Sequence, residues 1–212
     1  MFVCYGEGMR PITLALVALK GGVGKTTTAV HLVEAGYRRW GAARLVDADP
    51  HGGALAWADS GGEGGPILDS AVIGLATADV GRRIEQLGPS PFTVIDTGAG
   101  RPDISLAALG AADAAIVPVT PSVLDALQLG ATLDLAAKTA TPAAVLITRA
   151  RANTVALREL RAVLEDQQLP VLRTVIPDRQ SLARAAGARV DRHWVDLYAD
   201  VLEEILDAIK ED

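Results

Sequence analysis

The chain has 212 residues, of which 50% are hydrophobic and only 4% aromatic, and it carries a net charge of −6. That length predicts one domain that buries about 70% of its unfolded surface in an aliphatic core. The negative charge argues against a constitutively basic nucleic-acid-binding protein. The single cysteine, Cys4, excludes an internal disulfide and a four-cysteine metal site within one chain. No apolar run approaches the ~20 residues that a membrane-spanning helix needs.

Residues 1–10 lack the basic start and long apolar core of a signal peptide, and we expect a disordered extension there. Along residues 11–212 apolar runs alternate with amphipathic segments, which predicts a single α/β domain with a mostly parallel, twisted sheet flanked by helices. We place strands at 12–19, 43–48, 67–73, 92–96, 113–119, 143–148 and 171–176. We place helices at 25–39, 53–60, 79–87, 102–110, 122–138, 153–167, 178–187 and 194–210.

The first strand and the first helix are joined by the glycine-rich segment Lys20-Gly21-Gly22-Val23-Gly24-Lys25-Thr26-Thr27. A phosphate-binding loop requires this context, because glycines let backbone N–H groups curl around phosphate oxygens and the helix N-terminus adds positive charge. Lys25 is placed to contact the β- and γ-phosphates, and the Thr26 hydroxyl to ligate Mg²⁺. The strict Walker A pattern has a glycine at the position of Leu19, whereas this loop opens with a second lysine, Lys20.

Two later strands end in carboxylates: Asp47 and Asp49 lie at the end of the second strand, and Asp96 is the last residue of the fourth. At the C-terminal ends of parallel strands beside a phosphate loop, such side chains lie in the crevice where ligands bind. The run Phe92–Asp96 has the Walker B arrangement, in which a buried strand delivers one carboxylate to the metal. The turn 97–100 that follows can form a switch whose backbone N–H senses a γ-phosphate.

The string KGGVGKTT resembles the deviant Walker A loop of the ParA/MinD family of ATPases, and DADPHG at 47–52 resembles the family's DxDPQG motif. His51 stands where the family usually has glutamine. The segment 112–121 is similar to the family's "ADxxIxPVxP" strand, and the TGAG turn in a short chain resembles compact, ParF-type partition ATPases. The resemblance covers residues 11 to about 190 and implies the P-loop NTPase fold.

The resemblance also implies roles for individual residues. Lys20 would reach across a dimer interface to the phosphates held by the other subunit, and Asp49 would position the attacking water. The implied catalytic residues are Lys20, Lys25 and Asp49. The implied nucleotide contacts are Lys20, Gly21, Gly22, Val23, Gly24, Lys25, Thr26 and Thr27, with Arg149, Pro177 and Asp178 near the base. The implied metal-side residues are Thr26, Asp47 and Asp96.

The function implied is an ATP- and Mg²⁺-dependent ATPase that hydrolyses slowly until a partner stimulates it. It would form a homodimer with ATP, bind nonspecific DNA as that dimer, and drive plasmid or chromosome partition or cargo positioning. The expected partner is a centromere-binding or cargo-adaptor protein, and the expected location is the cytoplasm, on the nucleoid and not on a membrane.

Charge is unevenly distributed along the chain: residues 149–193 carry 9 arginines against 5 acids, and residues 194–212 carry 1 lysine against 7 acids. The arginine-rich segment is either a binding face or ordinary solvated helix surface. One alternative function is a MinD-like membrane-surface ATPase, but the acidic last helix has the wrong charge for anionic lipid, and we expect it to pack on the core. The other is a small-molecule phosphoryl-transfer or ligase enzyme of the same loop class.

Overall fold

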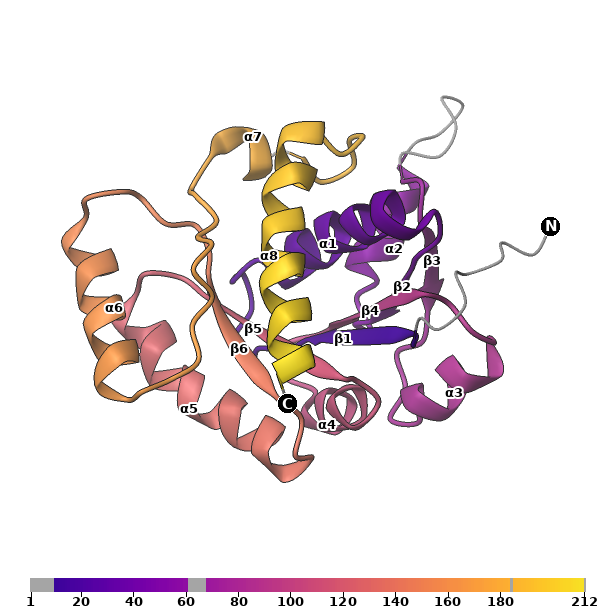
Figure 1. The fold of residues 1–212 in the computed structure, drawn as a ribbon, viewed down its shortest axis with the longest axis horizontal. Coiled ribbons are helices and arrows are strands. Elements are labelled where there is room, and N and C mark those ends of the chain that lie inside the picture. The colour runs from indigo at the N-terminus through magenta and orange to yellow at the C-terminus, as the bar shows by residue number, and fades with distance from the viewer. Residues whose placement is uncertain (1–9, 61–67, 184, 212) are drawn as a thin grey trace.

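The computed structural model describes residues 10–60, 68–183 and 185–211. Within them, six parallel strands form one sheet in the order β3-β2-β4-β1-β5-β6 (Figure 1). The strands are β1 (Ile12–Leu16), β2 (Arg44–Ala48), β3 (Ala71–Gly74), β4 (Phe92–Thr97), β5 (Ala114–Val119) and β6 (Ala143–Ile147). The helices are α1 (Lys25–Trp40), α2 (Gly53–Asp59), α3 (Val80–Gln86), α4 (Pro102–Gly110), α5 (Val123–Lys138), α6 (Val155–Asp166), α7 (Gln180–Ala183) and α8 (Arg192–Glu211). The predicted parallel α/β fold is therefore confirmed.

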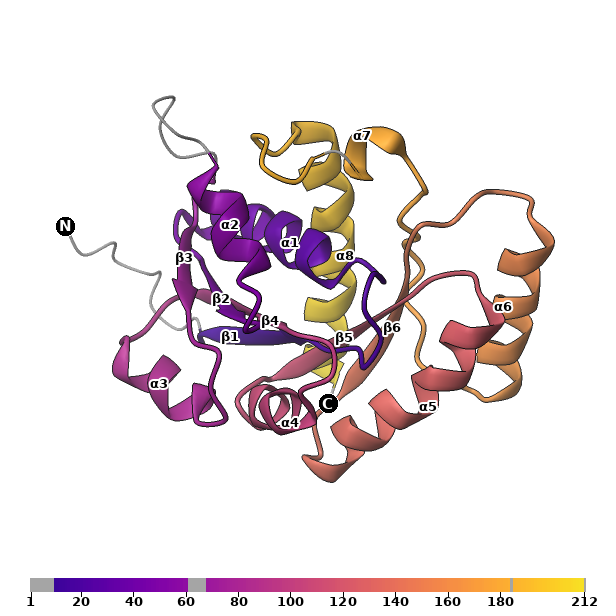
Figure 2. The same cartoon turned by 180° about the vertical axis from the view of Figure 1, so that it is seen from behind.

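Helices cover both faces of the sheet, with α1, α2 and α8 on one face and α3, α4 and α5 on the other (Figures 1 and 2). Helix α6 lies beside α5 near the β6 edge, where their apolar side chains share a core cluster with β5 and β6. The last helix packs on the core as predicted, through Trp194, Tyr198, Val201, Leu202 and Ile205. Among the described residues, no helix combines the length and the apolar character needed to cross a membrane.

Three predicted elements differ from the structure. The strand predicted at 171–176 is wrong, because only Val171 forms a bridge with β6 and the backbone N–H groups of Arg173 and Thr174 donate instead to the Glu204 carboxylate of α8. The helix predicted at 178–187 shortens to α7, with residue 184 outside the described part. The third predicted strand is β3 at 71–74, preceded by two residues that donate N–H groups to the Glu34 carboxylate.

Two predicted elements lie partly or almost wholly outside the described residues. The predicted extension over residues 1–10 lies, apart from Arg10, outside the described residues. Residue 67, the predicted first residue of the third strand, lies outside them as well.

Helix α1 approaches the sheet closely at Gly36. A Cβ atom added there would lie 2.1 Å from Cδ1 of Phe92, a fully buried side chain of β4. We therefore predict that Gly36→Ala lowers the free energy of unfolding by about 2–4 kcal/mol, as measured by urea denaturation. The matched control is Gly130→Ala in α5, where a Cβ meets open space and stability should stay unchanged or rise by up to about 1 kcal/mol. Equal stability of the two variants would contradict this account of the α1 contact.

Candidate functional site

The loops that follow β1, β2, β4, β5 and β6 meet at one edge of the sheet, because parallel strands place their C-terminal ends together. The loop between β1 and α1 curls through Gly22 and Gly24, whose φ angles of 78° and 91° favour glycine. The Thr148 hydroxyl, at the end of β6, donates to the carbonyl of Val23 at 2.8 Å and to that of Val119 at 3.2 Å. This hydroxyl ties the predicted phosphate loop to the ends of β5 and β6.

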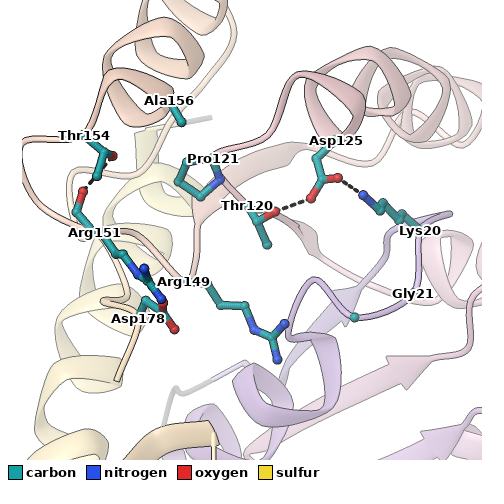
Figure 3. Close-up of a pocket in the computed structure, with 11 residues that line it drawn as sticks. Lys20, Gly21, Thr120, Pro121, Asp125, Arg149, Arg151, Thr154, Ala156 and Asp178 are labelled. Atoms are coloured by element: carbon teal, nitrogen blue, oxygen red, sulfur yellow. Dashed lines mark hydrogen bonds and ion pairs between the residues drawn. The ribbon is translucent and has the colours of Figure 1, made fainter. Parts of the chain in front are cut away.

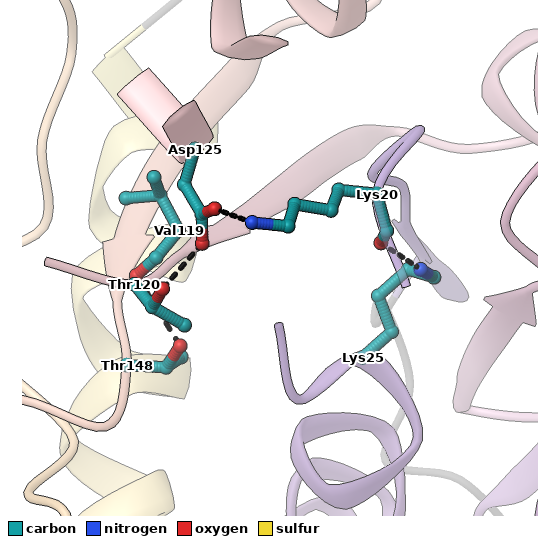
Figure 4. A network of polar contacts seen from close by, with 6 residues as sticks. All are labelled: Lys20, Lys25, Val119, Thr120, Asp125 and Thr148. Carbon is teal, nitrogen blue, oxygen red and sulfur yellow. Dashed lines mark hydrogen bonds and ion pairs between the residues drawn. The ribbon is translucent and has the colours of Figure 1, made fainter. Parts of the chain in front are cut away.

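Lys25 begins α1 and is buried beneath the loop. Its ammonium donates to the backbone carbonyl of Lys20 at 3.0 Å (Figure 4). Burial lowers the pKa of this ammonium, while the negative charges of Asp96 and Asp49 oppose that shift. A desolvated cation at the start of a helix, beside a glycine-rich loop, is arranged to gain from an anionic ligand in that loop.

Lys20 has a different environment, although it belongs to the same loop. Its ammonium pairs with the carboxylate of Asp125 in the first turn of α5, and that carboxylate also accepts the hydroxyl of Thr120 (Figure 4). The Lys20 side chain is 37% exposed, whereas the Asp125 side chain is 3% exposed. Lys20 therefore points away from the interior of its own loop, and Asp125 is a buried counter-charge whose pKa the Lys20 ammonium and the Thr120 hydroxyl lower against the effect of burial.

The sheet register places Asp47 of β2 directly beside Asp96 of β4. Asp47 is used by the backbone: its carboxylate accepts the N–H groups of Ala54 and Leu55 at 2.9 Å and of Asp49 at 3.1 Å, and so caps the start of α2. Asp96 is fully buried, and neither of its carboxylate oxygens has a hydrogen-bond partner among the described residues. Burial has the largest effect on the pKa of Asp96 and, with the charges of Asp47 and Asp49, raises it to about 7, although the nearby Thr26 hydroxyl and the Lys25 ammonium act to lower it.

Two buried oxygens without partners fit a hard cation, which prefers carboxylate and hydroxyl ligands. Thr26, the other predicted metal-side residue, lies beside the start of α2, since a Cβ on Gly53 would lie 3.6 Å from its hydroxyl. Among the described residues, no three acidic, histidine or cysteine side chains are grouped to hold a metal by themselves. A cation at Asp96 would therefore take further ligands from a bound molecule, as Mg²⁺ does with phosphates.

Asp49 lies between two loops of the site. Its Oδ1 accepts hydrogen bonds from the backbone N–H of His51 and from the His51 ring, both at 2.9 Å. On its other side, a Cβ added to Gly98 would lie 2.6 Å from Oδ1. The glycine of the turn after β4 thus lets the two predicted switch segments meet at this carboxylate.

The three predicted base contacts, Arg149, Pro177 and Asp178, line one small pocket with Gly24, Thr27 and Thr28 from the loop and start of α1. Arg149 and Asp178 also border a cavity of about 540 Å³ that Lys20, Gly21 and Gly22 line from the opposite side (Figure 3). Arg149 has a φ angle of 50°, which is unusual outside glycine. Its guanidinium points toward the phosphate loop in Figure 3.

Two residues that organise this site, Asp125 and Thr148, are not among the predicted site residues. Asp125 stands in the first turn of a predicted helix, where an acid is ordinary because it complements the helix dipole, so its pattern carries no signal of an ion pair. Thr148 was expected only as the end of a strand. The signal available for both is their position in the segments that follow β5 and β6, at the edge where the predicted ligand loop lies.

His31, buried between α1 and α8 and stacked on Tyr198, gives stability a pH dependence. Burial lowers the pKa of His31 from 6.5 to about 4. The stability that neutral His31 contributes is therefore present above pH 6.5 and is lost as the pH falls toward 4, by about 2.5 kcal/mol at pH 4.5. Asp96, whose pKa is raised in the folded chain, changes the stability with pH in the opposite direction. The contribution of His31 is therefore obtained by comparing the unmodified chain with a His31 variant.

We predict that the free energy of unfolding, measured in urea at pH 7.5 and 4.5, falls by about 2.5 kcal/mol more in the unmodified chain than in His31→Leu. Asp96 is present in both proteins, and its effect cancels in this comparison. The same loss in both proteins would contradict the burial of a neutral imidazole.

The chain is similar to known nucleotide-binding proteins. Residues 14–190 match the model of the family described as the CobQ/CobB/MinD/ParA nucleotide binding domain. The maintenance of carboxysome distribution protein A of Gloeobacter kilaueensis is 34% identical over 184 residues, covering 83% of this chain and 81% of that protein.

Solved structures share the fold as well. The structure of a putative plasmid partition protein from Borrelia burgdorferi bound to AMPPNP aligns with a TM-score of 0.79 at 18% identity, covering 94% of this chain and 100% of that one. The structure of cobyrinic acid a,c-diamide synthase from Mycobacterium smegmatis with a bound ATP analogue and magnesium aligns with a TM-score of 0.73 at 21% identity, covering 93% and 94% of the two chains. From the match to the family model and to the Gloeobacter protein, we conclude that this chain belongs to the CobQ/CobB/MinD/ParA family of nucleotide-binding domains.

Proposed function

We propose that this protein is an ATP-dependent dimerising switch that binds Mg·ATP, closes face to face with a second copy, binds nonspecific DNA as the dimer, and positions DNA or a protein cargo. The observation that carries the proposal is that the two lysines of one loop have different environments. Lys25 is buried and directed at the loop interior, whereas Lys20 is partly exposed and held outside it by Asp125. A second cation placed there is suited to a phosphate bound by another copy of the chain.

In this proposal the loop 20–27 holds the phosphates, and Arg149, Pro177 and Asp178 border the base. Thr26 and Asp96 would hold Mg²⁺. Asp47, on the metal side of the site, holds the loop that leads into α2 through its hydrogen bonds to backbone N–H groups. The ion would neutralise phosphate charge when bound. Asp49 orients the attacking water, and Lys20 and Lys25 stabilise the charge that develops on the transferred phosphoryl group.

The arginine-rich segment supports a DNA-binding face. A groove of about 870 Å³ lies between α6 and residues 175–180, and Arg151, Arg161 and Arg179 line it. Arg161 and Arg179 are exposed and form no ion pair within the described part of the chain, whereas Arg151 is held by Asp178 at 2.7 Å. Dimerisation would bring two such grooves to one duplex, and affinity grows steeply when phosphate contacts double.

The test is retention of the protein on nonspecific duplex DNA at several salt concentrations, with ATP, ADP or no nucleotide. We expect retention with ATP alone, and a weaker salt dependence for Arg161→Ala/Arg179→Ala, whose dimer would lose about four phosphate contacts. The matched control is Arg82→Ala/Arg83→Ala, a pair of exposed arginines on α3 at the other end of the sheet. No retention by a protein that still dimerises with ATP would refute DNA binding and leave a protein or membrane surface as the target.

The slow, partner-stimulated hydrolysis and the location on the nucleoid belong to the same proposal. The carboxysome-distribution relative favours a positioning role over synthesis of a small molecule. Hydrolysis that requires an added small substrate, rather than a second copy of the chain, would instead favour the ligase alternative.

A further inference from the structure

The contact between His51 and Asp49 joins an exposed and a half-buried loop residue at the centre of the site. His51 follows Asp49 by two positions, and its side chain is 88% exposed, whereas that of Asp49 is 20% exposed. Two hydrogen bonds, from the His51 backbone N–H and from ring Nδ1, reach the same carboxylate oxygen, Oδ1. The other oxygen, Oδ2, receives no hydrogen bond from His51.

The chemistry of the pair fixes the proton on the ring. An ionised carboxylate only accepts hydrogen bonds, so Nδ1 of His51 must carry the hydrogen that it shares with Asp49. In the neutral imidazole, Nε2 is then an acceptor open to solvent. This tautomer is the less common one for a free histidine, which gives the contact a spectroscopic signature.

Besides its contacts with His51, the Asp49 carboxylate packs against the backbone of Gly98. Gly98 packs against it from the turn after β4, where a Cβ would lie 2.6 Å from Oδ1 and 3.3 Å from Oδ2. Glycine supplies contact but no donor side chain, so among the described residues the His51 ring is the side chain that hydrogen-bonds this carboxylate, in addition to the His51 backbone N–H. A water-orienting group must be held within a narrow range of angles to be effective.

We propose that His51 is a positioning residue for hydrolysis, whose Nδ1–H holds Asp49 Oδ1 so that Oδ2 remains directed to the attacking water. The proposal rests on the proposed function, because it assigns to Asp49 the orientation of that water. His51 acts through Asp49 and touches neither the nucleotide nor the water.

A second Asp-x-His segment provides an internal comparison. At the start of α8, the backbone N–H of His193 donates to Asp191 Oδ1 at 2.8 Å, as His51 does to Asp49. The His193 ring packs against Trp194, with ring centroids 4.9 Å apart, and makes no hydrogen bond to Asp191 in the described structure. The same backbone turn therefore occurs once with the ring contact and once without it.

The first experiment measures the tautomers of the three histidines by ¹⁵N NMR of the imidazoles, assigned with His51→Gln and His193→Gln. Neutral His51 should be the Nδ1–H form, and Asp49→Ala should return it to the Nε2–H form without altering His31 or His193. An Nε2–H form of His51 in the unmodified chain would overturn the proposal.

The second experiment compares rates of ATP hydrolysis at saturating ATP. His51→Ala should lower kcat about tenfold with little change in KM. His51→Asn should restore most of the rate, because its amide nitrogen is attached to Cγ as Nδ1 is, and His193→Gln should hydrolyse ATP at the unmodified rate. Hydrolysis that depends on Asp49 but not on His51 would refute this inference alone. Absence of hydrolysis by the unmodified chain would refute the proposed function and the role of His51 with it.

Discussion

Lys20→Gln is expected to abolish ATP-dependent dimerisation while leaving nucleotide binding to the single chain nearly intact. Lys25, the loop glycines and the N-terminus of α1 remain in place, so the phosphates keep their contacts within the chain. What is lost is a cation that would face the nucleotide of the other subunit. Two opposite charges at 4 Å near a protein surface attract by about 4 kcal/mol, and two such lysines act in one symmetric dimer.

The ion pair between Lys20 and Asp125 reduces the free energy gained when Lys20 contacts the other subunit's nucleotide. When Lys20 turns to the partner's nucleotide, Asp125 is left as a buried carboxylate with the Thr120 hydroxyl as its remaining side-chain partner. Leaving a buried charge unpaired is costly, so the net effect per dimer falls to about 3 kcal/mol. That value corresponds to a dimer dissociation constant raised by at least about a hundredfold in Lys20→Gln.

The measurement is the dimer dissociation constant in Mg·ATP, with nucleotide affinity of the monomer determined separately. Lys138→Gln, at an exposed position on α5, is the matched control and should dimerise normally. Asp125→Asn should act in the opposite direction and promote dimerisation, because it releases Lys20. A Lys20→Gln chain that dimerises as tightly as the unmodified chain would refute the sandwich in which this lysine bridges two subunits.

Asp49→Ala is expected to lower the rate of ATP hydrolysis by at least about a hundredfold and to trap the ATP-bound dimer. The carboxylate lies where the loops after β2 and β4 meet, against Gly98, and removing it leaves the phosphate loop unchanged. The loss corresponds to about 2.7 kcal/mol of transition-state stabilisation, which is typical for a group that orients a reacting water.

Single-turnover hydrolysis and the lifetime of the dimer after ATP is diluted test this second prediction together. Asp134→Ala, which removes an exposed acid from α5, should show the unmodified rate and lifetime. Rapid turnover by Asp49→Ala would remove this residue from the hydrolytic role, whatever the state of the dimer.

Much of the fold follows from local pattern, and the exceptions have physical causes. Strands β2, β4, β5 and β6 were predictable because each is a buried apolar run between turn residues. The segment 171–176 looks equally apolar, but the long-range contact of Glu204 with its N–H groups interrupts the ladder. No pattern within the segment itself could predict a carboxylate 30 residues away.

The residues of the site likewise fall into those that local sequence predicts and those that depend on distant contacts. The phosphate loop could be predicted because its glycines and lysines act over adjacent residues, and Asp96 because a buried strand must end at the ligand edge. The partner of Lys20 could not, since Asp125 is 105 residues away and meets it only through the order of β1 and β5 in the sheet. The roles of Lys20, Asp49 and the residues near the base stay predictions until nucleotide is bound.

The mass of the protein in solution with Mg·ATP, with ADP and without nucleotide tests the central claim most directly. Light scattering should give the 22.0 kDa monomer without nucleotide and with ADP, and twice that mass with Mg·ATP when hydrolysis is slow. A monomer under all three conditions, in a protein shown to bind ATP, would contradict a dimerising switch.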